Sequence, residues 1–265
     1  MNNNKLSILG SGWLGLPLAA ELINQGYQVK LSTRQAEKVL AIEQVGAVPY
    51  LVDLDDSHGL SNGFFEDVEL LICNITYKNK AGFSALIEHV SQFGIKHVLF
   101  VSSTSVYQNN NSLVSEDISA VNTENVLYQI ERAFQASCDF KTTILRLSGL
   151  IGYRRHPGRF FAQGRAVSQP NAPVNLIHRD DCIGIISQII KKNAWGHVFN
   201  GCCDTHPTKR EFYSYARSLL GESPPIFSDI AQIQTKIVSN AKIKRVLGYG
   251  LIYPDLMRIP FNEIG

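Results

Sequence analysis

The residues whose spacing most clearly indicates chemistry stand near the front of the chain, in Gly10-Ser11-Gly12-Trp13-Leu14-Gly15. Three glycines in a G-x-G-x-x-G pattern are typical of a turn that binds a dinucleotide. The first permits a tight bend, the second lets the backbone approach a pyrophosphate, and the third lets a helix pack closely on a strand. An apolar run, Leu6–Leu9, precedes the motif, and Leu14–Gln25 follows with helical spacing. The pattern predicts a dinucleotide site with its phosphates at a helix N-terminus.

The end of the second expected strand indicates which nicotinamide cofactor is used. NAD enzymes usually place an acidic residue about twenty residues past the glycines, where it binds the ribose 2′-hydroxyl. This chain has Ser32-Thr33-Arg34 there, and hydroxyls with a guanidinium suit a 2′-phosphate. The sequence favours NADP(H) over NAD(H), the alternative being that Thr33 caps the next helix and Arg34 is solvated. Asp53 and Asn74 end the next two expected strands and are further candidate cofactor contacts, although Asp53 could equally cap a turn.

A cluster of hydroxyl residues, Ser102-Ser103-Thr104-Ser105, ends the fifth expected strand. The carboxyl end of a central strand is where the reactive ring of the cofactor is expected to lie. We therefore expect Ser102 to contact the cofactor. Together with Val106-Tyr107, the segment resembles the Ser-Ser-x-x-Val-Tyr signature of the extended short-chain dehydrogenase/reductase superfamily, which includes the NAD-dependent epimerases and dehydratases.

The resemblance covers nearly the whole chain. Leu145-Arg146-Leu147 resembles a later strand of the superfamily, and Val174–Asp181 resembles its His-x-Asp-Asp turn. Gly12–Ala19 and His156–Phe161 resemble more narrowly an atypical, YeeZ-like branch, whose members are mostly described as NAD(P)-dependent oxidoreductases. By position, the resemblance implies that Ser103 hydrogen-bonds the reacting oxygen. It also implies that Thr104 and Ser105 line the substrate side.

The chain departs from the superfamily in its proton-transfer residues, a Tyr-x-x-x-Lys on the helix after the fifth strand. Alignment through Glu116 and Asn125 places Val126 and Ile130 at these two positions, and neither side chain can move a proton. Tyr128 starts a Tyr-x-x-x-Arg two residues later, a displacement of roughly 200° around a helix. Tyr107 is a second candidate proton donor, although the superfamily's tyrosine at this position usually packs structurally. Ser103, Tyr107 and Tyr128 are therefore the candidate catalytic residues.

The densest basic stretch is Gly152–Arg159, followed by Phe160-Phe161. We expect Arg155, His156 and Arg159 to contact an anionic substrate, the alternative being a solvated connecting loop. The later His178–Asp181 segment resembles a catalytic His–Asp pair. We interpret it as structural, with Asp180 as a helix N-cap and Asp181 in the first helical turn.

The elements that would position these residues alternate between strand and helix, which predicts an α/β, Rossmann-type doubly wound parallel sheet with helices on both faces. A small C-terminal substrate lobe is expected to follow. We expect residues 1–150 to form the dinucleotide-binding domain and residues 151–265 the lobe, with interleaving between them left open. The expected strands are Leu6–Leu9, Gln28–Ser32, Ala47–Val52, Val68–Asn74, His97–Ser102, Thr142–Arg146, Val174–Ile177, His197–Gly201 and Lys236–Ser239. The expected helices are Leu14–Gln25, Gln35–Val45, Ala81–Phe93, Asn125–Ser137, Cys182–Lys191, Lys209–Leu220 and Ala241–Leu247.

Composition narrows the range of partners. The chain has 265 residues and a formal net charge of +2, which gives no footprint for nucleic acid. No apolar run has the length of a membrane span, and no secretory signal precedes the first strand, so we expect a cytoplasmic protein. The five cysteines and scattered histidines lack ligand spacing, so no metal site is expected. The expected helix around Val126–Phe134 pairs subunits in many relatives, which makes a homodimer an expectation.

These observations predict an NAD(P)-dependent oxidoreductase, with NADP(H) preferred, that transfers hydride to or from a small carbonyl, alcohol or aldehyde substrate. The alternative is a sensor or scaffold that binds NAD(P) without turnover. A nucleotide-sugar epimerase or dehydratase is less favoured, because those reactions need strong proton transfer.

Overall fold

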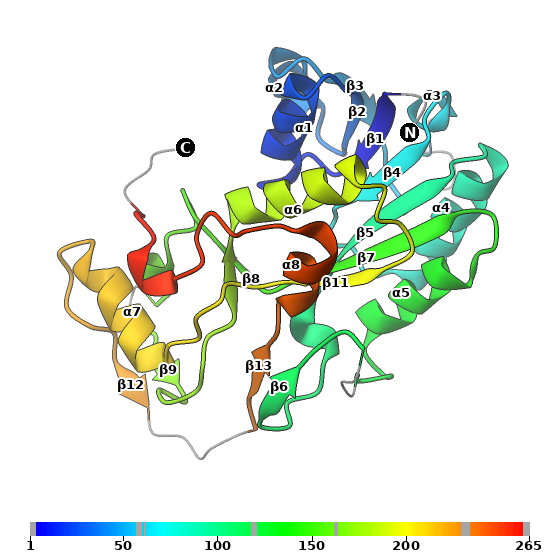
Figure 1. Ribbon diagram of the computed structural model, residues 1–265. Helices are drawn as coiled ribbons and strands as arrows, with labels where there is room; N and C mark the ends of the chain where they lie inside the picture. Colours follow the sequence, from blue (N-terminus) through cyan, green and yellow to red (C-terminus); the bar gives the residue numbers. More distant parts are fainter. Residues whose placement is uncertain are drawn as a thin grey trace. The chain divides into compact units, whose positions relative to one another are not determined.

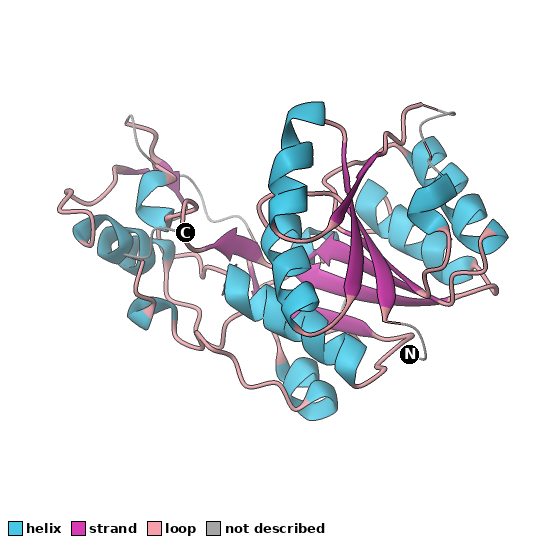
Figure 2. Cartoon of the chain, turned by 90° about the horizontal axis from the view of Figure 1, so that it is seen from above, coloured by secondary structure: helices cyan, strands magenta, loops and turns pink. Residues whose placement is uncertain are grey.

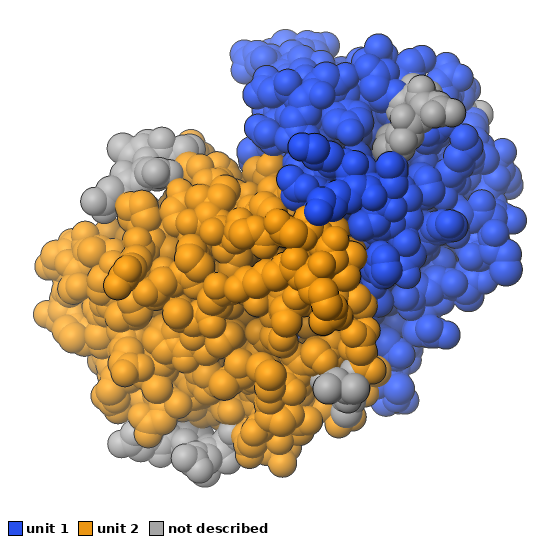
Figure 3. Space-filling model, viewed as in Figure 1, with its two compact units in different colours: residues 1–106, 122–146, 186–198 blue, residues 107–121, 147–185, 199–265 orange. Residues whose placement is uncertain are grey.

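The computed structural model describes residues 4–56, 60, 62–117, 121–161, 164–228 and 234–261. The chain forms two compact units, each assembled from three segments (Figure 3). Unit 1 contains residues 1–106, 122–146 and 186–198, and unit 2 contains residues 107–121, 147–185 and 199–265. The chain therefore passes repeatedly between the two units, one of which holds the glycine motif and the other the basic stretch.

A seven-stranded parallel sheet carries the residues that could do chemistry (Figure 1). Its order is β11-β7-β5-β4-β1-β2-β3. The strand bounds are β1 (Lys5–Leu9), β2 (Gln28–Thr33), β3 (Val48–Leu51), β4 (Leu70–Cys73), β5 (His97–Ser103), β7 (Lys141–Leu147) and β11 (Val198–Gly201). From β1 the sheet grows one way through β2 and the other way through β4, so the order reverses there. Doubly wound sheets bind their ligands at such a switch point, and the predicted Rossmann-type fold is confirmed.

Helices lie on both sides of this sheet (Figure 2). The helices that alternate with its strands along the chain are α1 (Gly15–Asn24), α2 (Val39–Gln44), α3 (Asn62–Phe65), α4 (Lys80–Gln92), α5 (Val126–Ala136) and α6 (Arg179–Lys191). One apolar layer joins α4 and α5 to the sheet, where Phe83, Phe100 and Phe134 pack edge to face or tilted. β1, β4 and β7 are largely buried because helices cover them, as expected of a parallel sheet, whereas the edge strand β3 is partly exposed.

Two expected helices differ from those observed. The helix expected over residues 35–45 begins as a 3-10 helix, η1 (Ala36–Lys38), and becomes α-helical only in α2. Its start lacks a side-chain cap at Gln35. The expected helix start at Cys182 is three residues late, because Nδ1 of His178 accepts the N–H of Asp180 at 3.3 Å and lets α6 begin at Arg179. The prediction that Asp180 is the N-cap is therefore wrong.

Unit 2 is built from small pieces around its own apolar core. Six short strands among its described residues form three parallel pairs, and Phe212, Leu256 and Ile259 belong to its core. The pairs are β8 (Gly149–Ile151) with β10 (Leu176–His178), β9 (Val167–Ser168) with β12 (Phe227–Ser228), and β6 (Ser112–Val114) with β13 (Lys236–Val238). The helices are α7 (Lys209–Ser218) and α8 (Ala241–Leu247), with 3-10 turns η3 (Pro157–Arg159) and η4 (Leu256–Arg258).

Candidate functional site

The β1–α1 turn has the geometry that a dinucleotide requires of its three glycines. Gly10 has φ +108°, a region that side chains disfavour, and a Cβ there would lie 2.5 Å from the carbonyl oxygen of Asn74. A Cβ at Gly15 would lie 1.8 Å from the carbonyl oxygen of Gly10. Gly12 is exposed and a Cβ there would meet nothing within 4 Å. The close contacts at Gly10 and Gly15 make the turn tight. The backbone at Gly12 is exposed, so a pyrophosphate could approach it.

Four further predicted cofactor residues lie in or beside this turn. Ser11 and Trp13 are half-buried within it, and Leu14, which precedes α1, is buried and gives the helix no side-chain cap. An uncapped helix start leaves its N–H groups for water or a phosphate. Asn74 is half-buried, and its backbone N–H donates to the Leu9 carbonyl at 2.9 Å. The structure therefore brings the ends of β1 and β4 together around the glycines.

The Ser32-Thr33-Arg34 segment divides into two buried hydroxyls and one exposed cation. The Oγ of Ser32 accepts the Gly10 N–H at 2.9 Å, so this serine supports the glycine turn. Thr33 Oγ1 accepts the Gln35 N–H at 3.1 Å, which shapes the turn before η1. Ser32 and Thr33 are only 2% and 4% exposed, whereas the Arg34 side chain lies in solvent. Arg34 is thus the member of the segment best placed for a ligand.

The loops that follow β3 and β4 form a polar cluster beside this segment, which the sequence did not predict. Asp53, a predicted cofactor contact, accepts the Asp55 N–H at 3.0 Å and shapes the loop after β3. The Asp55 carboxylate accepts hydrogen bonds from the Tyr77 hydroxyl and the Asn79 amide. These bonds, with a smaller contribution from the charge of Arg34, hold the pKa of Asp55 below its usual value. Burial, followed by the bond to Asp55, raises the pKa of Tyr77 to about 12.

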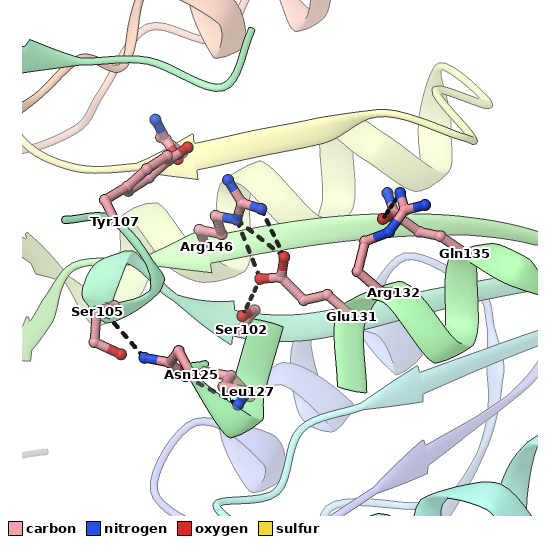
Figure 4. Close-up of polar contacts among 10 residues, drawn as sticks. Ser102, Ser105, Tyr107, Asn125, Leu127, Glu131, Arg132, Gln135 and Arg146 are labelled. Atoms are coloured by element: carbon pink, nitrogen blue, oxygen red, sulfur yellow. Dashed lines mark hydrogen bonds and ion pairs between the residues drawn. The ribbon is translucent and has the colours of Figure 1, made fainter. Parts of the chain in front are cut away.

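The hydroxyl cluster at the end of β5 also divides by burial. Ser102 is 6% exposed and donates to Glu131, so its hydroxyl hydrogen is engaged inside the protein (Figure 4). Ser103 is half-buried, and its Oγ accepts the Ser105 N–H at 3.1 Å, which leaves its hydroxyl hydrogen for another acceptor. Thr104 is buried, whereas the Ser105 side chain is exposed. Of the four, Ser103 combines an anchored oxygen with access to solvent.

Beneath the cluster lies a buried ion pair that the sequence analysis also missed. Arg146 on β7 donates two hydrogen bonds to Glu131 on α5, from Nη2 to Oε2 at 2.6 Å and from Nε to Oε1 at 3.1 Å (Figure 4). Glu131 is 0% exposed and Arg146 is 4% exposed. A charge inside an apolar strand, as in Leu145-Arg146-Leu147, is a signal that could have indicated a buried partner. The pair joins α5 to β7, and the hydrogen bond from Ser102 to Glu131 joins the same helix to the end of β5.

On α5 itself, the positions aligned with the superfamily's proton-transfer pair are apolar. Ile130 is 1% exposed in the core, and Val126 is the first helical residue. Tyr128 is half-buried, with the Arg146 guanidinium 6.0 Å from its ring centre. Arg132, the last residue of the Tyr-x-x-x-Arg, is exposed and bonds Gln135, pointing away from Glu131 (Figure 4).

Tyr107, the other candidate proton donor, belongs to unit 2. It is 3% exposed, and its hydroxyl donates to Oδ1 of Asn200 at 2.9 Å. Asn200 in turn donates its backbone N–H to Glu116 at 2.7 Å. Burial is the largest cause of the raised pKa of Glu116. This arrangement matches a tyrosine that packs and tethers its hydroxyl.

The basic stretch in unit 2 has three exposed arginines, Arg154, Arg155 and Arg159, and the last two are the predicted substrate contacts. His156, predicted with them as a substrate contact, is 3% exposed, and its Nδ1 accepts the Gly158 N–H at 3.0 Å. Burial, with the nearby charge of Arg159, lowers the pKa of His156. His156 therefore caps η3 as a neutral ring.

A second cluster of unit 2 surrounds the start of α6. Tyr153 has φ +51°, its hydroxyl donates to Asp180 at 3.0 Å, and the Arg179 guanidinium lies 3.7 Å from its ring centre. Burial lowers the pKa of His178 to about 4. Asp181 is 0% exposed and accepts the N–H groups of Ile252 and Tyr253, so it ties the C-terminal segment to the helix. The structural interpretation of Asp181 agrees with these contacts.

Comparison with known proteins agrees with a dinucleotide site at the glycine turn. Residues 10–181 match the family described as NAD(P)H-binding. The chain therefore belongs to the family of NAD(P)H-binding proteins, as the resemblance predicted. Protein YeeZ of Escherichia coli (strain K12) is 32% identical over 278 aligned positions, which cover 97% of this chain and 99% of YeeZ.

Solved structures extend the comparison. A candidate NAD-dependent epimerase/dehydratase from Methylobacillus flagellatus is 26% identical, covers 95% of this chain and 94% of its own, and has a TM-score of 0.79. The UDP-glucose 4-epimerase of Thermotoga maritima, solved with UDP-glucose, is 17% identical over 96% of both chains, with a TM-score of 0.77. This second likeness concerns the fold. Within the described residues, no cluster of His, Cys, Asp or Glu could hold a metal ion, and no helix is long and apolar enough to cross a membrane.

Proposed function

We propose that the chain is an NADP(H)-dependent oxidoreductase that transfers hydride to or from a small carbonyl, alcohol or aldehyde substrate. The observation that carries the proposal is the open Gly12 between two closed glycines, on the same sheet edge as the accessible Ser103. Arg34, exposed at the end of β2, supports the preference for the 2′-phosphate. NADPH, when bound, supplies the hydride, and the chain supplies binding, orientation and a hydrogen bond.

Ser103 is the residue proposed to contact the substrate oxygen. Its Oγ is anchored by the Ser105 N–H, so the hydroxyl can donate to a carbonyl and stabilise negative charge as it develops there. For proton delivery we propose Tyr128 or water. Tyr107 is the weaker candidate, because its hydroxyl hydrogen is engaged by Asn200.

An anionic substrate is part of the proposal, with Arg155 and Arg159 as its contacts and His156 as support for the turn that carries them. Arg159→Ala should weaken the substrate's apparent affinity at least tenfold and leave cofactor affinity unchanged, because loss of a charge-assisted hydrogen bond costs about 1.5–3 kcal/mol. Steady-state KM values and cofactor titration measure the two quantities. Equal losses of both would contradict the assignment.

A second candidate function is a sensor that binds NAD(P) without turnover, favoured by Val126 and by Ile130 in the core. The same apolar pair weighs against an epimerase or dehydratase, although similar solved structures include such proteins. Enzymes can do without a strong acid only where the cofactor performs the difficult step.

The test begins with calorimetric titration of NADPH, NADP⁺, NADH and NAD⁺. Tight binding that favours the phosphorylated pair supports the proposal, and no binding of any of the four contradicts it. A panel of aldehydes and ketones, some carrying phosphate or carboxylate groups, then tests for consumption of NADPH. Ser103→Ala should lower kcat by at least tenfold with unchanged NADPH affinity, whereas Ser84→Ala, at an exposed serine of α4, serves as the matched control. Binding without turnover on any substrate favours the sensor.

A further inference from the structure

The exposed Arg34 has an acidic neighbour whose position is controlled from elsewhere in unit 1. We propose that Asp55, held by Tyr77 and Asn79, sets the discrimination between the 2′-phosphate of NADP(H) and the 2′-hydroxyl of NAD(H), because this anchoring keeps its carboxylate from neutralising Arg34. The inference rests on the proposed NADP(H)-dependent function. The inference adds Asp55 to Arg34 as a residue that determines cofactor specificity.

The position of Asp55 is fixed by two donors from the loop between β4 and α4. The Tyr77 hydroxyl and the Nδ2 of Asn79 both donate to the same oxygen, Oδ1, the latter at 3.2 Å. Asn79 is also the N-cap of α4, where its Oδ1 accepts the Ala81 N–H at 3.0 Å. The same side chain therefore starts the helix and orients the carboxylate.

Tyr77 is itself confined by close packing. Its ring meets Phe83 edge to face, with ring centres 5.4 Å apart. A Cβ at Gly82 would lie 2.4 Å from the Tyr77 hydroxyl and 2.8 Å from the Leu54 carbonyl oxygen. Only a glycine at this position lets α4 approach the phenol and the loop after β3 so closely. The hydroxyl is thus directed at Asp55 by the packing of the helix.

Arg34 lies close enough for its charge to act on this carboxylate without pairing with it. Its charge is one of the causes of the lowered pKa of Asp55, after the two hydrogen bonds. The ion pairs formed among the residues that the structure describes do not include Arg34. A guanidinium in this state can offer its planar fork to a phosphate in a bidentate contact.

The parallel register places this group where the adenosine end of a dinucleotide is read. β2 pairs in parallel with both β1 and β3, so Gly10, Arg34 and Asp53 all follow strands that end at the same edge. Ionised Asp55 repels a 2′-phosphate and does not repel a 2′-hydroxyl. Released from Tyr77, it would also capture Arg34. Substitution of Asp55 and substitution of Tyr77 should therefore change NADPH affinity in opposite directions.

The experiment measures NADPH and NADH affinity calorimetrically for the full chain and four variants. Arg34→Ala should weaken NADPH at least tenfold and change NADH little. Asp55→Asn, which keeps an oxygen to accept from Tyr77, should tighten NADPH about threefold, the size of a screened interaction between charges several ångströms apart. Tyr77→Phe should weaken NADPH about threefold. The double variant Asp55→Asn/Tyr77→Phe should abolish that loss, because no carboxylate remains to capture Arg34.

The matched control for net charge is Asp139→Asn, an exposed acid just before β7 at the opposite sheet edge. It should leave both affinities unchanged. If Arg34→Ala alters the NADPH/NADH ratio while Asp55→Asn and Tyr77→Phe do not, the role of Asp55 is overturned and the proposed cofactor stands. If the natural chain binds neither cofactor, or Arg34→Ala leaves NADPH affinity unchanged, the NADP(H) proposal fails with it.

Discussion

Two arginines at the carboxyl ends of parallel strands differ in burial and in pairing. Arg146, near the end of β7, is 4% exposed, and Glu131 neutralises it with paired hydrogen bonds. Arg34, just after β2, is exposed and lacks an ion pair among the described residues. A buried charge needs a partner because its desolvation is costly, whereas an exposed charge is solvated and accessible to a ligand. The comparison teaches that residue type alone does not separate a binding cation from a structural one.

The hydroxyls beside these arginines follow the same division. Ser102 donates into the buried pair, and Ser103, the next residue, keeps its hydroxyl hydrogen. Successive residues of a strand point to opposite faces. Ser102 therefore points into the protein, whereas Ser103 is accessible to solvent. Around α5, the edge of the sheet is stabilised by hydrogen bonds and an ion pair inside the protein.

The largest expected effect tests the internally paired region. Glu131→Ala should reduce the free energy of unfolding by about 3–5 kcal/mol, because it leaves the Arg146 charge buried without its carboxylate. Denaturant titration followed by circular dichroism measures the loss. The exposed Arg132→Ala on the same helix is the control and should stay within about 0.5 kcal/mol. A loss below 1 kcal/mol for Glu131→Ala would mean that water or another group replaces the pair.

The next prediction extends the comparison to a titratable ring in unit 2. His178 has a pKa of about 4 in the folded chain, lowered from 6.5 by burial. Between these values the unfolded chain binds more protons, so stability falls as the pH is lowered. The expected loss is about 2 kcal/mol between pH 6.5 and 5.

His178→Asn tests this assignment, because asparagine retains an acceptor for the Asp180 N–H but does not titrate. Stability measured at several pH values should show a shallower acid dependence in the variant. Other buried histidines, such as His156 and His206, also have lowered pKa values and leave a residual slope. An unchanged slope would show that His178 stays solvated.

A smaller effect is expected where the edge is open. Gly12→Ala adds a methyl group with nothing within 4 Å, so stability should change by less than about 0.5 kcal/mol. Dinucleotide affinity should nevertheless fall at least tenfold, equivalent to about 1.4 kcal/mol, because the backbone can no longer approach the pyrophosphate. Calorimetry and thermal unfolding separate the two readouts. Retained affinity would place the phosphates elsewhere.

The smallest effect concerns the cap that joins the hydroxyl cluster to α5. Asn125 accepts the Leu127 N–H at 2.9 Å and donates to the Ser105 carbonyl at 3.2 Å. Asn125→Ala should cost about 1 kcal/mol of stability, and Asn125→Ser should recover most of it. Denaturation midpoints provide the measurement. Equal losses for both variants would show that the bond to Ser105, rather than the cap, dominates.

The sequence predicted what local spacing controls. The alternation of strands and helices in a Rossmann-type sheet is confirmed, although α3 and the short strands β6, β8, β9 and β12 were not expected. Sequence reasoning could not pair residues that tertiary packing brings together. Glu131 and Arg146 are 15 positions apart on different elements, and Asp55 and Tyr77 are 22 apart. Burial of Ser32, Ser102 and His156 likewise depends on neighbours that no local pattern specifies.

The interleaving of the units has a consequence for how the molecule is made. The last segment of unit 1, residues 186–198, is translated only after residues 147–185 of unit 2. It supplies Ser187, which bonds Gln25 at the end of α1, and Gly196, whose N–H bonds Thr143 on β7. Folding of the dinucleotide-binding unit must therefore wait for most of the chain to leave the ribosome, since contacts between distant segments form slowly. A truncated gene ending near residue 150 should yield an aggregating fragment rather than a small cofactor-binding domain.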